Sequence, residues 1–475
     1  MERQPKPAVS MMQEITDQSS RTVLLNTFVV KKKRCRVYFH RGTLIWETEK
    51  PPYTRWTLPM TDVLAVRYGD DWIHGVNLKE KQPPPTSPTS PTVCPTNFIL
   101  HYAVRGPKNK WSHHSVTMSH TDPRQVASWV KTIRNYLMGL THRPRKILLF
   151  INPFGGKKKG LKIWEKDVQP LMTIAGIDAK ILVTERVGHI RDVLLSVDLT
   201  DFHAIVCIGG DGTVAEVING LVLRTSRDRQ IDPNNPEANL PTPRLPIGVI
   251  PSGSTDTIAY SLHGTTDVQT ATIHIIFGDS TGLDVSSVHN DQSLLRLYAS
   301  MLSYGYLGDV IRDSEKFRWM GPQRYDYSGW LTIRGKFFMV NGANLACGCS
   351  RSPMGFSPHC HVGDGCVDVI LVRHTSLFNN IRMLLRLSSK QKTLYDLPFV
   401  EVYRAREFTF RTLPTLHMQS TSEISNRYLN SSLSVWNCDG EVIDSSNVKI
   451  RVHCQLVNIF TRRAQEPVHG RTCFC

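Results

Sequence analysis

The segment that most constrains the fold is Gly209-Gly210-Asp211-Gly212-Thr213, which follows an apolar run (204–208) and precedes a helical pattern (214–223). A strand that passes through glycines into a helix places that turn at the carboxyl end of the strand. Glycines let backbone N–H groups approach an anion, and the N-terminus of the helix favours negative charge. Asp211 adds a carboxylate that can bind Mg²⁺ or accept a proton from a hydroxyl. If this segment stood alone, an ordinary tight turn would also explain these residues.

Two more small-residue loops follow apolar runs. Residues 147–151 lead into Asn152-Pro153-Phe154-Gly155-Gly156-Lys157-Lys158-Lys159-Gly160, and residues 247–250 lead into Pro251-Ser252-Gly253-Ser254-Thr255-Asp256. The first loop lacks the final Gly-Lys-Ser/Thr of a Walker sequence, and its lysines either neutralise phosphate or form a solvated face. In the second loop, Ser254 or Thr255 can instead cap a helix. Three such loops at strand ends favour one nucleotide site over three unrelated turns.

Strand patterns alternate with helix patterns from Lys146 onward, with helices predicted at 161–175 and 189–197 and a further strand at 180–184. This alternation is typical of a parallel sheet with crossover helices, and such sheets bind ligands at the carboxyl ends of their strands. After Asp279 strand patterns dominate, at 282–288, 336–340, 367–372, 408–410 and 448–456. We therefore expect an α/β nucleotide-binding lobe at 145–278 and a mostly antiparallel β lobe at 279–460, with the ligand cleft between them.

The region 21–140 has a different pattern. Short strands are predicted at 23–30, 36–40, 42–46, 63–68, 97–104 and 115–118, and a helix at 123–138 places Val126, Trp129, Ile133 and Leu137 on one face. A β-barrel closed by one helix with a central tryptophan resembles a pleckstrin-homology domain, and another small β-barrel is the alternative. The Pro/Ser/Thr run at 83–92 is expected to be an exposed loop.

Composition narrows the class of protein. The net charge of +16 favours anionic partners, which leaves nucleic acid, ATP and acidic lipid open. No nucleic-acid-binding motif accompanies the charge, so we expect no nucleic acid partner. The sequence has no apolar run of roughly 20 residues and no signal core after Met1. The eleven cysteines are scattered, which indicates reduced thiols and a cytoplasmic location.

The three loops together resemble the signatures of the diacylglycerol-kinase-type catalytic fold, a superfamily that contains diacylglycerol, sphingosine and ceramide kinases. Segments 283–289, 308–316, 324–329, 349–353 and 436–441 resemble the ceramide kinase family in particular. The resemblance covers about residues 145–460, although the stretch from Tyr327 to Lys336 is shorter than in that family. It implies Mg²⁺-dependent transfer of the ATP γ-phosphate to the primary hydroxyl of ceramide. A sphingoid-base or diacylglycerol kinase is one alternative, and a catalytically silent regulatory lipid-binding protein is the other.

The resemblance also implies roles for individual residues. Asp211 would be the general base, and Asp211 and Asp439 would ligate the metal. The lipid headgroup would lie near Gly209, Gly210, Asp211, Gly212 and Asp309. The nucleotide would be bound by Asn152, Pro153, Phe154, Gly155, Gly156, Thr184, Glu185, Arg186, Val187, Glu216, Gly253, Ser254, Thr255, Arg318, Arg324, Asp439, Gly440 and Glu441. Without the resemblance, Arg318 and Arg324 fit surface ion pairs, and Asp439-Gly440 fits a hairpin turn.

Three segments outside the predicted nucleotide site indicate what else the protein binds. Lys31-Lys32-Lys33-Arg34 is either a contact for an anionic or phosphoinositide membrane surface or a solvated loop. The basic amphipathic pattern at 378–392 fits a packed helix with a solvated basic face, a membrane-binding segment or a calmodulin target, with Ca²⁺ as a possible regulator. The terminal Cys473-Phe474-Cys475 is either a lipidation site or a coincidence. These features predict peripheral association with a membrane, with the Golgi and plasma membranes as candidates.

Overall fold

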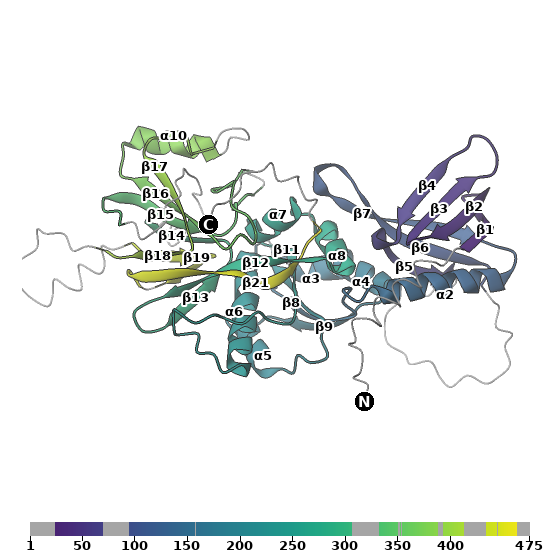
Figure 1. The fold of residues 1–475 in the computed structure, drawn as a ribbon, viewed down its shortest axis with the longest axis horizontal. Coiled ribbons are helices and arrows are strands. Elements are labelled where there is room, and N and C mark those ends of the chain that lie inside the picture. Colours follow the sequence, from purple (N-terminus) through teal and green to yellow (C-terminus); the bar gives the residue numbers. More distant parts are fainter. Residues whose placement is uncertain are drawn as a thin grey trace, which may run out of the picture. The chain divides into compact units, whose positions relative to one another are not determined.

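The computed structural model describes residues 24–69, 95–156, 158–305, 332–349, 352, 354–387, 393–412, 434–443 and 445–462 (Figure 1). The chain divides into two compact units. The first unit comprises residues 1–145, 170–177 and 276–278, and the second comprises residues 146–169, 178–275 and 279–475.

The first unit is built on a seven-stranded antiparallel sheet with the order β4-β3-β2-β1-β7-β6-β5. Its elements are β1 Leu24–Val30, β2 Lys33–His40, β3 Thr43–Thr48, β4 Arg55–Pro59, β5 Val63–Tyr68, β6 Asn97–Arg105, β7 Trp111–Ser119 and α2 Pro123–Gly139. The sequence pattern predicted each of these elements except β4. Only Leu58 of β4 is buried, so this strand has no alternating apolar pattern to detect.

Helix α2 closes the sheet of the first unit. It begins where the carboxylate of Asp122 accepts the N–H of Arg124, and Pro123 occupies a first-turn position where its missing N–H costs nothing. Trp129 is 2% exposed, and its ring contacts that of Phe28 edge-on at 5.2 Å between centroids. The predicted barrel, helix and central tryptophan are therefore confirmed.

The second unit contains a sheet with the order β13-β12-β21-β11-β10-β8-β9, and β18 also pairs with β21. Its strands are β8 Lys146–Ile151, β9 Asp178–Val183, β10 Ala204–Gly209, β11 Ile247–Pro251, β12 Ser280–His289, β13 Leu294–Tyr298, β18 Glu407–Phe410 and β21 Val448–Phe460. The predicted parallel arrangement holds for β8 to β11. β21 runs parallel to β11 and antiparallel to β12, so strands from 279–460 extend the sheet formed by 145–278.

Helices α5 His189–Ser196, α6 Asp211–Asp228, α7 Thr257–His263 and α8 Val268–Phe277 accompany this sheet. The helix predicted at 161–175 is confirmed as one helical run, in which a π-helical turn at Trp164–Val168 separates α3 Gly160–Ile163 from α4 Gln169–Ala175. Pro170 lacks an N–H group and would clash with the preceding turn of a regular α-helix. The wider π turn directly before Pro170 accommodates it.

A six-stranded antiparallel sheet with the order β17-β16-β15-β14-β19-β20 completes the second unit. Its strands are β14 Met301–Gly305, β15 Phe337–Ala343, β16 Val367–Arg373, β17 Val400–Ala405, β19 Trp436–Cys438 and β20 Glu441–Ile443, and α10 Leu377–Leu387 lies over it. The sequence pattern missed β13, β14, β17, β19 and β20. Strands β19 and β20 have three residues each, which is too short for a periodic signal.

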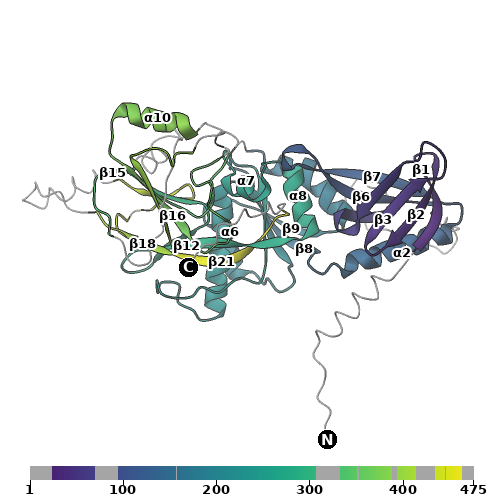
Figure 2. The ribbon, with the colours of Figure 1, turned by 45° about the horizontal axis from the view of Figure 1, so that its top comes forward.

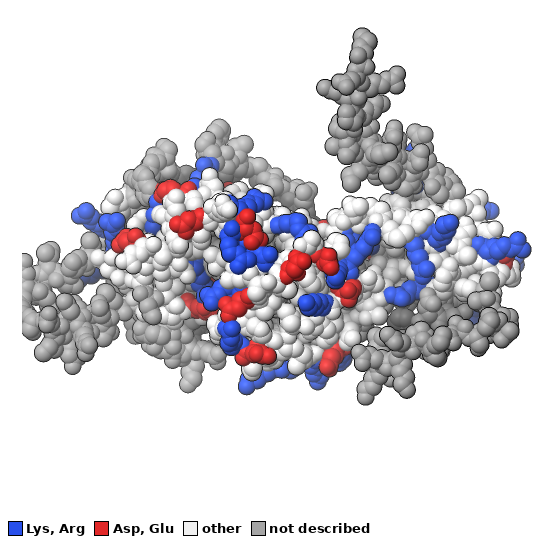
Figure 3. Space-filling model, turned by 90° about the horizontal axis from the view of Figure 1, so that it is seen from below, with Lys and Arg blue, Asp and Glu red and all other residues white. Residues whose placement is uncertain are grey.

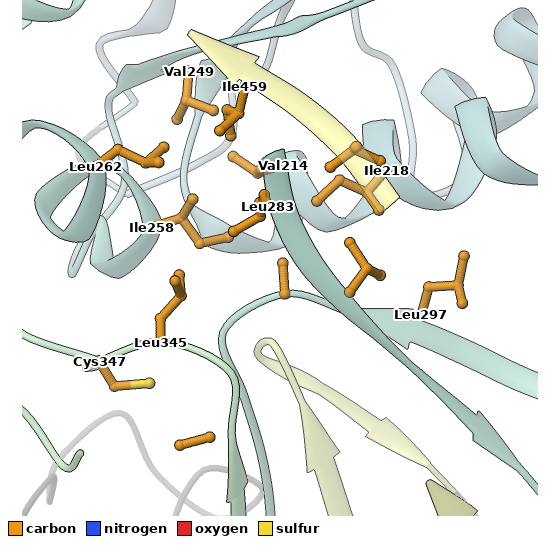
Figure 4. Packing of buried hydrophobic residues seen from close by; sticks show 14 of the residues in the cluster. Val214, Ile218, Val249, Ile258, Leu262, Leu283, Leu297, Leu345, Cys347 and Ile459 are labelled. Carbon is orange, nitrogen blue, oxygen red and sulfur yellow. The ribbon is translucent and has the colours of Figure 1, made fainter. Parts of the chain in front are cut away.

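One buried cluster connects the elements of the second unit. Figure 4 shows Val214 of α6, Ile258 of α7, Leu283 of β12 and Ile459 of β21 packed together, although they come from distant parts of the sequence. Leu345, which follows β15, joins the same cluster. The helix that starts at Asp211 is therefore held by both sheets.

The surface shows no single basic field on the face drawn in Figure 3, where Lys and Arg lie among Asp and Glu. Ion pairs such as Arg224–Asp228 and Lys146–Asp201 join side chains of opposite charge in the second unit. None of the helices in the described part of the chain is long and apolar enough to cross a membrane.

Candidate active site

Three loops start at the same edge of the parallel sheet. Ile151 of β8 pairs with Ile208 of β10, and Gly209 pairs with Pro251 of β11. The N–H of Asn152 donates to the Ile208 carbonyl at 3.0 Å, and the N–H of Ser252 donates to the Gly209 carbonyl at 3.1 Å. The predicted gathering of the three glycine-bearing loops at strand ends is confirmed.

Glycines bring these loops into direct backbone contact. Gly156 has φ +53°, and a Cβ built on it would lie 2.6 Å from the Ser252 carbonyl oxygen. A Cβ on Gly253 would lie 2.6 Å from the Cα of Gly210. Neither position can hold a side chain without moving a neighbouring loop. The loops therefore form one surface of closely spaced backbone groups, which we call the glycine cradle (Gly156, Gly210 and Gly253).

Asn152 organises the first loop. Its Oδ1 accepts the N–H groups of Phe154 at 2.9 Å and Gly155 at 3.1 Å. Its Nδ2 donates to the hydroxyl of Thr213 at 3.0 Å, which ties the loop to the first turn of α6. The Phe154 side chain is 64% exposed at the rim of this arrangement. The asparagine thus links two of the three loops through one side chain.

Asp211 is the first residue of α6, and its carboxylate also reaches α7. Oδ2 accepts the N–H of Thr257 at 3.0 Å, and Oδ1 accepts the N–H of Ile258 at 2.9 Å. The carboxylate therefore lies at two helix N-termini, where negative charge is favoured. These two bonds fix the carboxylate at the point where α6 and α7 both begin.

Asp256 was missed as a site residue by the sequence reasoning. It occupies the N-cap position of α7 with φ +54°, so neither Ser254 nor Thr255 caps that helix. Its Oδ1 accepts the N–H of Gly253 at 2.8 Å. Burial raises the pKa of Asp256 to about 6, and the nearby charge of Asp211 acts in the same direction. The Asp256 side chain makes no capping hydrogen bond to α7, so the capping preference of aspartate was no signal for this role.

Asp439 and Gly440 form the two-residue turn between β19 and β20, with φ +48° and +95°, as the hairpin interpretation predicted. The Asp439 carbonyl oxygen lies 3.8 Å from a Cβ built on Gly212, so this turn adjoins the first turn of α6. The carboxylate is 5% exposed and accepts the N–H groups of Ala299, Ser300 and Met301 and the hydroxyl of Ser300. These four donors saturate it, so the expected metal role of Asp439 does not fit this geometry.

Glu216 and Glu441 lie beside an arginine that the sequence did not single out. Glu216 accepts the N–H of Ile190 at 2.9 Å, and burial raises its pKa. Glu441 forms an ion pair with Arg296, whose side chain is 18% exposed. The charge of Glu441 raises the pKa of Glu216 further, and the charge of Arg296 lowers it. Arg296 lies in β13, a strand that the sequence pattern did not predict, so no sequence feature placed this arginine in the site.

The loop at 184–187 starts at the same edge, because β9 pairs with β8. The N–H of Thr184 donates to the Ile151 carbonyl at 2.9 Å. Arg186 forms an ion pair with Asp192 at 2.7 Å, and Val187 is 81% exposed. Of the other expected site residues, Pro153 lies in the first loop and the N–H of Glu185 donates to Nδ1 of His189 at 3.1 Å, whereas Asp309, Arg318 and Arg324 lie outside the described residues.

Comparisons with known proteins agree with this arrangement. The model of the ceramide kinase PH domain matches residues 24–133, that of the diacylglycerol kinase catalytic domain matches 146–288, and that of the ceramide kinase C-terminal domain matches 323–475. Human ceramide kinase is 34% identical over 530 aligned positions, which cover 92% of this chain and 96% of the human protein.

The chain belongs to the ceramide kinase family. Mouse ceramide kinase is 37% identical, over 78% of this chain and 85% of its own length. A solved diacylglycerol kinase from Bacillus anthracis is 17% identical with a TM-score of 0.47, and the match covers 67% of this chain and 97% of that one. The fold class expected for a ceramide kinase family member, a pleckstrin-homology domain followed by a mixed α/β and β lipid kinase, is confirmed.

Proposed function

We propose that this chain is an ATP-dependent lipid kinase that transfers the γ-phosphate of ATP to the primary hydroxyl of ceramide and forms ceramide 1-phosphate. Membership of the ceramide kinase family supports the substrate class. The observation that carries the proposal is the glycine cradle at the N-terminus of α6. Phosphoryl transfer depends mainly on positioning and charge neutralisation, and both need donors that can approach phosphate oxygens closely.

In this proposal the nucleotide lies over the loops 152–156, 184–187 and 253–255. Asn152 holds the first loop in place, and the start of α6 directs backbone N–H groups at the phosphates. Asp211 accepts the proton of the ceramide hydroxyl. Its two bonds to the start of α7 hold the carboxylate in one orientation, which favours a defined position for the attacking oxygen.

We further propose Mg²⁺ as the cation. Mg²⁺ usually takes one or two carboxylates and completes its shell with phosphate oxygens and water. Asp211 and Asp256 are the two carboxylates that we assign to it, because Asp256 is the residue directly before α7 and the Asp211 carboxylate accepts the first N–H groups of that helix. The described residues contain no group of three or more metal-binding side chains, so a substrate phosphate would have to share the ion. Bound there, Mg²⁺ would neutralise phosphate charge.

Peripheral membrane binding belongs to the same proposal. Lys31 and Lys32 form the turn between β1 and β2 of the pleckstrin-homology domain, Lys33 and Arg34 begin β2, and all four residues are exposed. We propose that this turn contacts phosphoinositides from the cytoplasmic side of a Golgi or plasma membrane. We do not propose a Ca²⁺–calmodulin partner for α10, because Met383 and Leu387 of that helix are buried and would have to leave the core for calmodulin to surround it.

The test is an assay with radiolabelled ATP and a panel of ceramide, sphingosine and diacylglycerol in matched micelles. Asp211→Asn should lose most activity, and Asp228→Asn, at the other end of α6, should keep it. Wild-type activity in Asp211→Asn would remove the assigned base. Preference for sphingosine or diacylglycerol would select the rival kinase, and failure to bind Mg-ATP in calorimetry would select the silent lipid-binding protein.

A further inference from the structure

Helix α10 exposes a large apolar surface to solvent. Four side chains form it, which we call the α10 apolar face: Leu377 at 75% exposure, Phe378 at 75%, Ile381 at 45% and Leu385 at 70%. Residues three or four positions apart on a helix are neighbours, so these four form one continuous stripe. Exposed apolar patches on soluble proteins are usually interaction sites.

The opposite side of α10 is held in the core of the second unit. Met383 is 1% exposed and Leu387 is 4% exposed, and both belong to the buried cluster that contains Ile370 of β16. Arg386 fixes the end of the helix through an ion pair with Asp396 at 2.9 Å. In Figures 1 and 2, α10 lies at the outer surface of its sheet. The apolar face therefore points outward from an anchored helix.

This geometry limits the kind of partner. A protein that wraps around an amphipathic helix needs all of its sides, and α10 would have to leave the core to provide them. A bilayer needs only one side, because an interfacial helix buries its apolar face and keeps its polar face in water. Arg382 is exposed and lies next to the stripe, where it can meet an anionic headgroup.

We propose that the α10 apolar face docks on a lipid bilayer and inserts its four side chains at the membrane interface, with Arg382 among the headgroups. The choice of a membrane rests partly on the proposed function, because ceramide carries two hydrocarbon chains and resides in a bilayer. Docking through α10 brings the six-stranded sheet of the second unit to the membrane that holds the proposed acceptor. The contact is separate from the basic β1–β2 turn.

The experiment is flotation of the full chain with vesicles of phosphatidylcholine and ceramide, with and without phosphatidylserine. The vesicles lack phosphoinositide, so that the pleckstrin-homology domain has no specific ligand. The variant Phe378→Ser/Leu385→Ser should reduce the vesicle-bound to free ratio at least tenfold. Ile181→Ser is the matched control, because this β9 side chain is 40% exposed and lies outside α10. Its ratio should equal that of the unsubstituted chain.

Activity is measured in parallel on ceramide in vesicles and on a water-soluble short-chain ceramide. The double variant should lose activity on vesicles and keep it on the soluble substrate. Unchanged vesicle binding by the double variant would overturn the proposal, as would loss of Ca²⁺–calmodulin binding with unchanged vesicle binding. If the unsubstituted chain phosphorylates neither ceramide but its vesicle binding depends on Phe378 and Leu385, the kinase assignment fails and the docking surface stands.

Discussion

The carboxylate of Asp439 accepts hydrogen bonds from both the N–H and the hydroxyl of Ser300. Ser300 lies between β13 and β14, where the chain leaves one sheet of the second unit and enters the other. The buried carboxylate thus fixes the corner between the two sheets, and the turn that carries it adjoins the start of α6. This contact couples the packing of the two sheets to the position of Asp211.

Asp439→Asn should therefore act on stability. Its amide would direct N–H groups at a site already lined by donors, and we expect a loss of about 2–4 kcal/mol in the free energy of unfolding. Urea unfolding measures this loss, with Asp201→Asn, a 77% exposed surface position, as the control. If Asp439→Asn instead had the stability of the unsubstituted chain but needed a higher Mg²⁺ concentration for activity, Asp439 would be a metal ligand after all.

Gly156→Ala should damage the glycine cradle. The new Cβ would lie 2.6 Å from the Ser252 carbonyl oxygen, and the residue would keep a positive φ. We expect a loss of roughly 1–3 kcal/mol in stability and weaker ATP binding. Gly139→Ala is the control, because no atom lies within 4 Å of its built Cβ. Calorimetric titration with Mg-ATP checks the result, and equal affinities in both variants would remove Gly156 from the nucleotide site.

Asn152→Ala should raise the KM for ATP more than it lowers stability. The substitution removes two bonds that shape the loop and one bond to Thr213. Each hydrogen bond contributes about 1 kcal/mol, so we expect an increase in KM of roughly tenfold or more. Thr213→Val removes only the bond between the two loops and should have a smaller effect. The same KM in all three proteins would show that this bonding does not shape the nucleotide site.

Stability should fall as the pH is lowered below 6.5. Burial lowers the pKa of His453 from 6.5 to about 4, so between these values the unfolded chain holds a proton that the folded chain lacks. The free energy of unfolding therefore decreases as pH falls through this window, by up to about 1.4 kcal/mol per pH unit for one such group. His453→Gln can still bond to Ser287 but cannot titrate, so it should flatten the slope in urea titrations at pH 7 and pH 5. An unchanged slope would contradict this assignment.

Charge reversal at residues 31–34 should release the chain from phosphoinositide vesicles. Each basic residue near an anionic surface contributes about 1 kcal/mol, so four reversals should abolish measurable binding at physiological salt. Reversal of Arg124 and Arg145, two basic residues outside this turn, provides a charge control. If the variant with four reversals still binds the vesicles, residues 31–34 are solvated and do not contact the membrane.

The sequence by itself determined the local features of this protein. Apolar runs followed by glycines located β8, β10 and β11 with the loops after them, and amphipathic spacing located α2 and its Trp129. These signals depend on neighbouring residues, so they can be read from the chain directly.

Only the tertiary structure decided which distant residues complete the site. The pairing of β21 with β11, the contact of Asp439 with Ser300 and the placement of Arg296 beside Glu441 join segments separated by more than one hundred residues. Such contacts depend on sheet order and on packing of the shared core, which leave no periodic trace in the sequence. For the same reason the pattern at 378–392 predicted an amphipathic helix, but only packing decided that Met383 and Leu387 are buried while Phe378 and Leu385 are exposed.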